Sequence, residues 1–542
     1  MIWQAFSDGL SVFVEKWPVV LIAVGVTSLG WSLSLFLLRN TSKEITSPWQ
    51  SLGLLIGFFA VSVILRLAFL TETLVPPYFD SVEHYRIIKE LVTAMDSSSL
   101  LETLPSLTPG YYHLGFHFLA SLLTFGLPAN LMDMILVLGQ VILAAIPIPL
   151  FFLIRGETKS NAAAFFGTLL AGFGWYMPGF AVNWGKYPAL AGLLALEIVL
   201  SMAYFISLKK SNRNQPLWIG LLILGIMVST LFHTRTLIVI VISFISWLIS
   251  GELGSLSKKF QYLSMGILLM GLLILGIQIK QEPLLTLTLE PYFKDGLWVT
   301  LTVVALSPFA LAKFPRSVCF SILFTLSVFV ALFVPIGNWL PGLENQTLLD
   351  RPFVEMLLYL PLSMLGGLGL GGLLQFLNDI KGFSEQINQY VRILAAVVFL
   401  GIASLTPVRN YNFYPSDCCN FVKYDDTIAL DWLEANLPAD AYILIPATQM
   451  NVLPSGPSAG LTGTDAGIWI PALTGKAITY AQFEIDFHSE STLEMLCQLQ
   501  IDYVYIGGTS QSFNVSQLLA KGNWYEAVLS LPDAQVYRLI GC

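Results

Sequence analysis

The residues with the clearest chemical potential follow an apolar run that ends near Leu70. Asp80, Glu83 and His84 occupy positions i, i+3 and i+4, so on a helix their side chains share one face. Acidic groups held at a membrane–water interface are costly and usually functional. This pattern indicates a carboxylate that deprotonates an acceptor, a divalent-metal site formed by Asp80 and Glu83, or both. The structural alternative is a solvated loop helix whose acids are favoured by the helix dipole.

The composition indicates what kind of protein must position these residues. Of the 542 residues, 55% are hydrophobic and 11% are charged, and the mean hydropathy is +0.71. A soluble protein would carry about 25% charged residues. Many apolar runs reach roughly 18–22 residues, which is the length that crosses a bilayer core. The chain is therefore predicted to be a polytopic α-helical membrane protein.

The basic residues of the short loops indicate how the chain crosses the bilayer. If the segment Gly110–Gly126 lies along the membrane surface, these residues all fall on one side, which the positive-inside rule assigns to the cytoplasm. The loop at 71–130, with its juxtamembrane helices, and the region from 408 onward then face the exterior. We expect about twelve spans, at 17–38, 50–70, 131–154, 161–182, 188–208, 216–233, 236–250, 261–279, 297–312, 317–335, 352–377 and 391–407.

The chain divides into a membrane region, 1–407, and a C-terminal region, 408–542. The C-terminal region carries five Lys or Arg against fourteen Asp or Glu, and no basic patch suggests a nucleic-acid partner. Helix and strand patterns alternate along it, which predicts a compact extracytoplasmic α/β domain. The expected elements are helices at 425–437, 493–499 and 517–521, strands at 442–445, 477–480 and 503–506, and a hairpin formed by 525–531 and 535–540.

Four of the five cysteines, Cys418, Cys419, Cys497 and Cys542, lie in the C-terminal region. If this region is extracytoplasmic, disulfides are expected and three full pairings are open. A bond between the adjacent Cys418 and Cys419 would be strained. Cys319 lies in an apolar span, where a packing role is expected.

Several cationic residues are predicted at the outer ends of the spans. Lys186 lies in a short turn, His233 and Arg235 lie in another, and Arg351 begins a late span. Each of them also suits an interfacial anchor. Arg66 lies inside a predicted span, where it is expected to pair with an acid or to snorkel outward.

Three short motifs resemble those of the GT-C superfamily of membrane glycosyltransferases. The segment Asp80–Arg86 is similar to the acidic motif of the family's first extracytoplasmic loop, and its aromatic-acid-His-Tyr-Arg surroundings weakly resemble the oligosaccharyltransferase branch. Pro109–Leu114 resembles the family's juxtamembrane helix. Gly463–Ile470 resembles a degraded Trp-Trp-Asp-Tyr-Gly motif that lacks both tryptophans before the Asp. The acidic loop follows the second span here, so 17–38 looks like an added helix.

The resemblance implies transfer of a sugar from a polyprenyl-phosphate donor to a lipid, glycan or protein acceptor. The site would lie on the extracytoplasmic face of a plasma membrane or bacterial inner membrane. Asp80 would be the general base, and Glu83 and His84 would orient it or help to bind Mg²⁺ or Mn²⁺. Cations would stabilise the leaving phosphate. The predicted phosphate-binding residues are Arg351, Arg235, His233 and Lys186, and the predicted acceptor-binding residues are Asp465 and Trp469.

Two other classes of protein are compatible with the sequence. A transporter or lipid-carrier flippase also has many spans, and the pairs Gly366–Gly367 and Gly371–Gly372 could interrupt one of them. A membrane scaffold with a binding domain is the second alternative, but it gives Asp80 no role.

Overall fold

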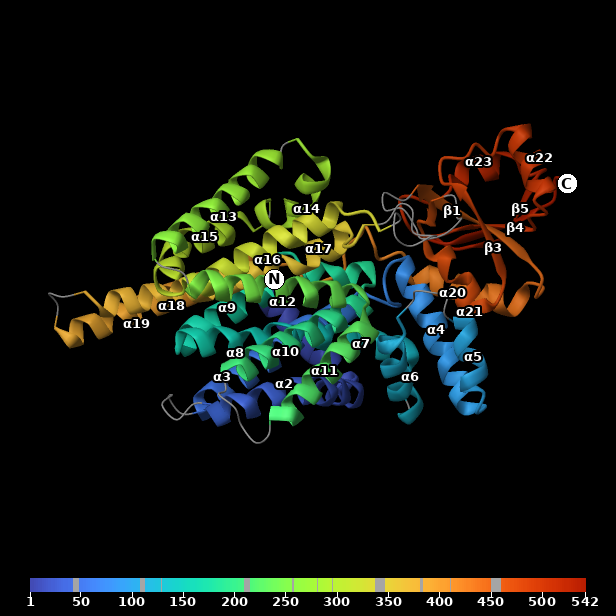
Figure 1. Ribbon diagram of the computed structural model, residues 1–542. Helices are drawn as coiled ribbons and strands as arrows, with labels where there is room; N and C mark the ends of the chain where they lie inside the picture. Colours follow the sequence, from blue (N-terminus) through green and yellow to red (C-terminus); the bar gives the residue numbers. More distant parts are fainter. Residues whose placement is uncertain are drawn as a thin grey trace.

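The computed structural model describes residues 1–41, 48–107, 113–127, 129–208, 215–255, 258–279, 281–294, 296–336, 347–380, 384–409, 411–449 and 460–542. These residues form a helical body, followed by a smaller domain built around a β-sheet (Figure 1). The domain lies at one end of the body, next to α4 and α5, and the first residues of α19 lie at the opposite end (Figure 1).

The helical body contains all the apolar segments predicted to cross the membrane. Its first half consists of α1 (Ile2–Glu15), α2 (Trp17–Thr41), α3 (Pro48–Leu67), η1 (Ala68–Thr71), α7 (Leu131–Ala145), α8 (Pro147–Thr158), α9 (Asn161–Phe173), η2 (Gly179–Trp184) and α10 (Tyr187–Leu208). Its second half consists of α11 (Gln215–Phe232), α12 (Arg235–Ser255), α13 (Lys258–Gln278), α14 (Pro283–Phe293), α15 (Leu297–Lys313), α16 (Pro315–Phe333), α17 (Arg351–Leu357), α18 (Tyr359–Asn378) and α19 (Glu385–Arg409).

The length and apolar character of these helices are those of a multi-pass membrane protein. Within the described residues, eight helices can cross a bilayer, and the number rises to ten if two sharply bent pairs each count as one span. One bent pair joins α1, which the sequence analysis did not predict, to α2 at 99°. The predicted segments 161–182 and 297–312 form the shorter helices α9 and α15, with 13 and 17 residues.

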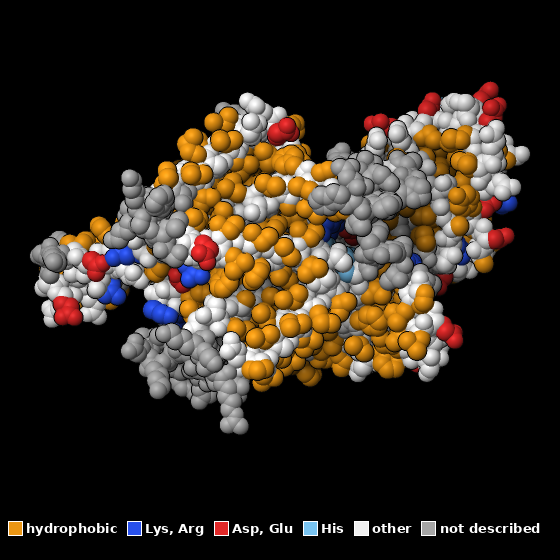
Figure 2. All heavy atoms as spheres, in the orientation of Figure 1, with side chains coloured by type: hydrophobic (Ala, Val, Ile, Leu, Met, Phe, Trp, Pro, Cys, Tyr) orange, Lys and Arg blue, Asp and Glu red, His pale blue; other side chains and the backbone are white. Residues whose placement is uncertain are grey.

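Hydrophobic side chains cover the body between its two ends, as expected for a surface that faces lipid (Figure 2). Charged side chains gather at the end formed by the start of α19 and on the C-terminal domain (Figure 2). At the α19 end, Lys313 pairs with Asp379 at 2.5 Å, and Arg392 donates to Asn378 at 2.8 Å. These two basic residues belong to the loops that were predicted to be cytoplasmic.

The glycines of α18 lie at helix–helix contacts and do not interrupt the helix. A Cβ atom on Gly372 would lie 2.2 Å from the carbonyl oxygen of Phe309, and one on Gly367 would lie 2.6 Å from Ile154. Small residues let the backbones of membrane helices approach closely. The expectation that Gly366–Gly367 and Gly371–Gly372 interrupt a span is therefore wrong, because α18 is continuous from Tyr359 to Asn378.

The segment 71–130 forms three helices beside the body, α4 (Phe79–Asp96), α5 (Leu100–Leu107) and α6 (Gly115–Gly126). The later turns of α4 have an apolar face, since Ile87, Ile88 and Leu91 are buried. The apolar segment predicted at Gly110–Gly126 is helical from Gly115 onward. Residues 108–112, which include most of the Pro109–Leu114 motif, lie outside the described residues.

The C-terminal domain contains every element predicted from its sequence. It consists of α20 (Tyr424–Asn436), β1 (Tyr442–Gln449), β2 (Leu461–Gly463), η3 (Ala466–Trp469), α21 (Ile470–Thr474), β3 (Ala477–Gln482), α22 (Glu490–Gln498), β4 (Tyr503–Ile506), α23 (Val515–Ala520), β5 (Tyr525–Ser530) and β6 (Gln535–Leu539). The strand order is β2-β1-β4-β6-β5, and β3 also pairs with β1. Strand β1 is parallel to β3 and β4, whereas β6 is antiparallel to both β4 and β5.

Candidate functional site

The first turn of α4 holds Asp80 against the turn that follows η2. Gly185 adopts a φ of 63°, and a Cβ atom on it would lie 2.3 Å from Oγ of Ser81, so this close contact requires glycine. The contact brings Lys186 to Asp80, with 2.5 Å between Nζ and Oδ2. Both side chains are partly buried, at 31% and 23% exposed.

Two further ion pairs form where helices of the body begin. Arg235, the first residue of α12, lies 2.9 Å from Oδ2 of Asp350. Asp350 also caps α17, because its Oδ1 accepts from the backbone N–H of Phe353 at 3.1 Å. Arg351 donates to Oε1 of Glu355 at 2.8 Å, and the Glu355 side chain is only 2% exposed. We call the six residues of the three ion pairs Lys186–Asp80, Arg235–Asp350 and Arg351–Glu355 the charged cluster.

Electrostatic effects show that the three pairs of the charged cluster lie near one another. Burial alone would lower the pKa of Lys186, but Asp80 and then Asp350 favour its charged form, and the net result is a raised pKa. Burial and then Asp80 raise the pKa of Tyr78, while Lys186 and Arg351 oppose this shift. Asp80 and Arg351 both act on Tyr78, so both lie at the same end of the body.

Figure 2 shows acidic, basic and histidine side chains in a recess between the apolar surface and the C-terminal domain. Four of the five histidines lie close to the charged cluster. Nδ1 of His84 lies 2.9 Å from Nε2 of His117, the rings of His113 and His233 are 4.3 Å apart, and His233 stacks on Phe353. The sequence analysis did not predict this group of histidines. The spacing of His113 and His117, four positions apart in a chain with few histidines, could have indicated it.

The surroundings of the four histidines favour the neutral form of each imidazole. Burial and then the charge of Lys186 lower the pKa of His84 to about 3. Burial followed by Arg235 lowers the pKa of His113 to about 4, and burial also lowers the pKa of His117 and His233. A neutral imidazole can donate one hydrogen bond but cannot supply positive charge. In this arrangement His233 could bind a phosphate by donating a hydrogen bond, and His84 faces His117.

Asp80 and Glu83 do not share a site. Glu83 forms an ion pair with Arg86 at 2.6 Å, its side chain is 47% exposed, and Arg86 also contacts Glu90. Asp80 instead contacts Lys186. Among the described residues, no three His, Cys, Asp or Glu side chains are grouped as metal ligands. In this arrangement the two predicted carboxylates have different partners, and the Mg²⁺ or Mn²⁺ site stays a prediction.

The two residues predicted to bind the acceptor lie in the interior of the C-terminal domain. Asp465 is fully buried and accepts from the backbone N–H groups of Gly467 and Gly507 and from the hydroxyl of Ser512, at 2.7–2.9 Å. Trp469 is 1% exposed, and its ring lies 5.6 Å from that of Tyr85 on α4. Trp469 thus helps to hold the domain against α4, and Asp465 organises the loops that meet at β4.

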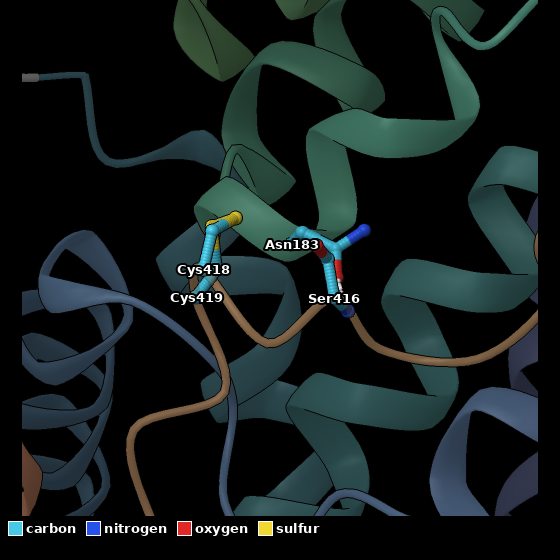
Figure 3. Close-up of a disulfide and its surroundings, with 4 residues drawn as sticks. All are labelled: Asn183, Ser416, Cys418 and Cys419. Atoms are coloured by element: carbon cyan, nitrogen blue, oxygen red, sulfur yellow. Dashed lines mark hydrogen bonds between the residues drawn. A yellow bond between two sulfur atoms is a disulfide. The ribbon is translucent and has the colours of Figure 1, made fainter. Parts of the chain in front are cut away.

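A short segment between α19 and α20 connects the C-terminal domain to the candidate site. The backbone N–H of Ser416 donates to Oδ1 of Asn183 at 2.7 Å, next to a disulfide between Cys418 and Cys419 (Figure 3). The carbonyl oxygen of Cys419 accepts from the backbone N–H of Tyr78 at 3.0 Å. The sequence analysis disfavoured this adjacent pair, but the structure forms it, and Cys497 pairs with Cys542.

Two acids of the charged cluster, Asp350 and Glu355, were not predicted as site residues. Arg351 and Glu355 are separated by four residues, so they lie on one face of a helix. That spacing could have predicted an ion pair, but the apolar residues around it made the segment resemble an ordinary membrane span.

A family profile matches residues 7–343, which is more than half of the chain. The chain belongs to DUF6541, a family of unknown function. The matched range includes Asp80, Lys186 and Arg235, and it ends before Arg351 and the C-terminal domain. Comparison with curated proteins gives no match.

Proposed function

We propose that this protein is a membrane glycosyltransferase that moves a sugar from a polyprenyl-phosphate donor to a lipid, glycan or protein acceptor. The observation that supports the proposal is the charged cluster, in which three cations and three carboxylates meet at the end of the body that carries the C-terminal domain. We place this end on the extracytoplasmic face of a plasma membrane or bacterial inner membrane, because Lys313 and Arg392, two of the basic residues assigned to the cytoplasmic side, lie at the other end.

Asp80 is the general base in this proposal. The acceptor hydroxyl attacks the anomeric carbon and loses its proton to Asp80, while the bond from that carbon to the phosphate oxygen breaks. The lipid phosphate leaves with the bonding electrons. Lys186, Arg235 and Arg351 then balance the charge that develops on it.

Donor binding must rearrange the charged cluster, because each cation already has a carboxylate partner. Lys186 is the most suitable residue to move, since a flexible ammonium can exchange one anion for another. When the donor phosphate attracts Lys186, the carboxylate of Asp80 becomes available to the acceptor. The same contact therefore couples donor binding to activation of the base.

The C-terminal domain takes the role of a fixed cover over the candidate site. Its Trp469 packs on Tyr85, and Lys89 of α4 donates to the carbonyl oxygen of Ala472 at 3.1 Å. These contacts lie one and two turns after Asp80 along α4. In the proposal, the domain positions α4 and presents the acceptor. Asp465 and Trp469 contribute indirectly, because Asp465 organises loops of the domain and Trp469 packs against α4.

The test is sugar transfer by the purified full-length protein from a panel of undecaprenyl-phosphate hexoses and pentoses. We expect Asp80→Asn and Arg351→Ala each to reduce transfer at least about 100-fold. Glu90→Gln, a charge change on the exposed face of α4, is the matched control. Normal turnover by both variants, with unchanged folding, would remove the assignment. A chelator series in the same assay tests whether transfer depends on Mg²⁺ or Mn²⁺.

A buried carboxylate in α10 favours a second candidate, a transporter or lipid-carrier flippase. Glu197 is fully buried and one of its oxygens accepts from the hydroxyl of Tyr359, whereas the other has no hydrogen-bond partner among the described residues. Ionisable residues inside a membrane commonly mark transport pathways. Reconstituted protein that moves a fluorescent polyprenyl-phosphate lipid between leaflets, and loses this activity as Glu197→Gln, would favour transport over sugar transfer.

A further inference from the structure

A second polar recess lies beside η2. It is bounded by the last turn of α3, by η2 and by the segment that follows α19, and it includes Arg66, Gln140, Gly179 and Tyr411. The space is about 370 Å³, including the part that opens to solvent. Its inner part has room for about one water-sized group, such as a single ligand oxygen. We call it the Arg66 recess.

The guanidinium of Arg66 is buried without a carboxylate partner. Arg66 is 4% exposed, so it does not snorkel, and among the described residues no acid forms an ion pair with it. It donates to the carbonyl oxygen of Gly172 at 2.9 Å and lies over the rings of Tyr411 and Phe173, at 4.5 and 5.3 Å. Ring contacts offset only part of the cost of burying a charge, which normally requires an anion.

Three buried polar groups at the Arg66 recess have donor hydrogens without an acceptor among the described residues. They are Nε of Arg66, Nε2 of Gln140 and the hydroxyl of Tyr411, whose oxygen contacts the Arg66 guanidinium, and each belongs to a residue that is at most 5% exposed. Unsatisfied buried groups are rare because each is costly. These three groups can all donate, and they come from α3, α7 and the segment after α19. Donors without acceptors around a buried cation have the chemistry of an anion-binding site.

We propose that the Arg66 recess binds a phosphate group, with one phosphate oxygen in the inner part and the remainder in the mouth. The aromatic side chains of Tyr176 and Phe180 line the mouth. A phosphate accepts from Arg66, Gln140 and Tyr411 together and supplies the missing negative charge. It can come from a lipid headgroup or from free phosphate. The site is separate from the charged cluster, because η2 contributes Asn183 to this recess whereas Lys186 contacts Asp80.

The experiment measures binding to the full-length protein in a neutral detergent, using thermal unfolding at increasing ligand concentration. The probes are dihexanoyl phosphatidic acid, dihexanoyl phosphatidylcholine and inorganic phosphate. We expect phosphatidic acid to bind and Arg66→Gln to raise its Kd about tenfold or more. Tyr411→Phe keeps the ring and removes one donor, so it should raise the Kd a few-fold. This milder variant tests the site even if Arg66→Gln does not fold.

The controls distinguish binding at the Arg66 recess from binding at other cationic residues. Arg392→Gln, at the opposite end of the body, should change the Kd less than about twofold. Binding of inorganic phosphate with the same dependence on Arg66 would identify the free ion as sufficient, and binding of phosphatidic acid alone would identify a lipid headgroup. The proposal is overturned if neither phosphatidic acid nor inorganic phosphate binds. It is also overturned if phosphatidylcholine, whose headgroup carries no net charge because choline balances the phosphodiester, binds equally well, or if Arg351→Gln abolishes binding while Arg66→Gln and Tyr411→Phe do not.

Discussion

Nζ of Lys186 lies 2.5 Å from Oδ2 of Asp80, across 106 residues of sequence. The contact depends on the left-handed turn at Gly185, which presses against the first turn of α4. The carboxylate with the clearest catalytic potential is therefore held by a cation, and Asp350 also attracts that cation. In the proposed reaction, Lys186 changes partner when a phosphate arrives.

Lys186→Gln should weaken donor binding more than it slows the chemical step. It removes a cation from the phosphate and leaves Asp80 without its partner, so we expect KM for the polyprenyl-phosphate sugar to rise about tenfold. Steady-state kinetics at varied donor concentration measure this. The exchange of partners would be contradicted by an unchanged KM together with a large loss of kcat.

Arg351→Gln should destabilise the protein as well as weaken phosphate binding, because it leaves the carboxylate of Glu355 buried and unpaired. Breaking a buried ion pair typically costs about 3–5 kcal/mol. The double variant Arg351→Gln/Glu355→Gln removes both charges and should recover most of this stability while donor binding stays weak. Thermal unfolding and donor KM, measured on both variants, separate the two effects. Full recovery of KM in the double variant would show that Arg351 does not bind phosphate.

Glu83→Gln should reduce sugar transfer far less than Asp80→Asn, although the two acids are three residues apart. Glu83 pairs with Arg86 on a half-exposed face, and such pairs contribute about 0–1 kcal/mol. Side-by-side transfer rates test this difference. Equal losses of activity in the two variants would instead support a shared site for Asp80 and Glu83, as the i, i+3, i+4 spacing suggested.

The arrangement of Glu83 illustrates what the sequence could and could not predict. Apolar runs located most helices of the body but not α1. Alternating helix and strand patterns located most elements of the C-terminal domain but not β2, η3 or α21, because local periodicity identifies only the more regular elements. The i, i+3 spacing correctly placed Asp80 and Glu83 on one helix. It did not show which cation each carboxylate would contact. The partner of Asp80 comes from a turn 106 residues away, and only tertiary packing reveals it.

The span count and the burial of Asp465 were harder to predict for a related reason. Hydropathy marks apolar segments but does not show that α1 meets α2 at 99° or that α9 has only 13 residues. Asp465 lies between glycines, as turn residues often do. Its burial results from the meeting of β2, η3 and β4, and no local pattern shows it.

The C-terminal domain should become less stable as the pH rises from about 4 to 7. Burial raises the pKa of Asp465 from 3.8 to about 7 and that of Asp426 from 3.8 to about 6. The folded state therefore binds these protons more tightly than the unfolded state, and this stabilisation is lost as the pH rises through the folded pKa. Hydrogen exchange of the β1 and β4 amides, corrected for intrinsic rates, measures it. Asp465→Asn should flatten the dependence, and an unchanged slope would contradict the assignment.

Cysteine labelling tests which side of the membrane holds the C-terminal domain. Disulfides persist in extracytoplasmic compartments, so Cys497 and Cys542 should resist a membrane-impermeant maleimide until intact cells are treated with reductant. Cys542→Ser should expose Cys497 to the reagent and, by opening a loop of 45 residues, destabilise the domain by about 2–4 kcal/mol. Labelling of the unreduced wild-type pair only after the cells are permeabilised would place the domain in the cytoplasm.

The most direct test of the account is one-sided sugar transfer in proteoliposomes of known orientation. A radiolabelled undecaprenyl-phosphate sugar, confined to the leaflet on the side of the C-terminal domain, should lose its sugar to a supplied acceptor with the wild-type protein. With Asp80→Asn, the loss should be at least about 100-fold slower. Transfer only from the opposite leaflet, or equal transfer by Asp80→Asn, would contradict a catalytic role for the charged cluster.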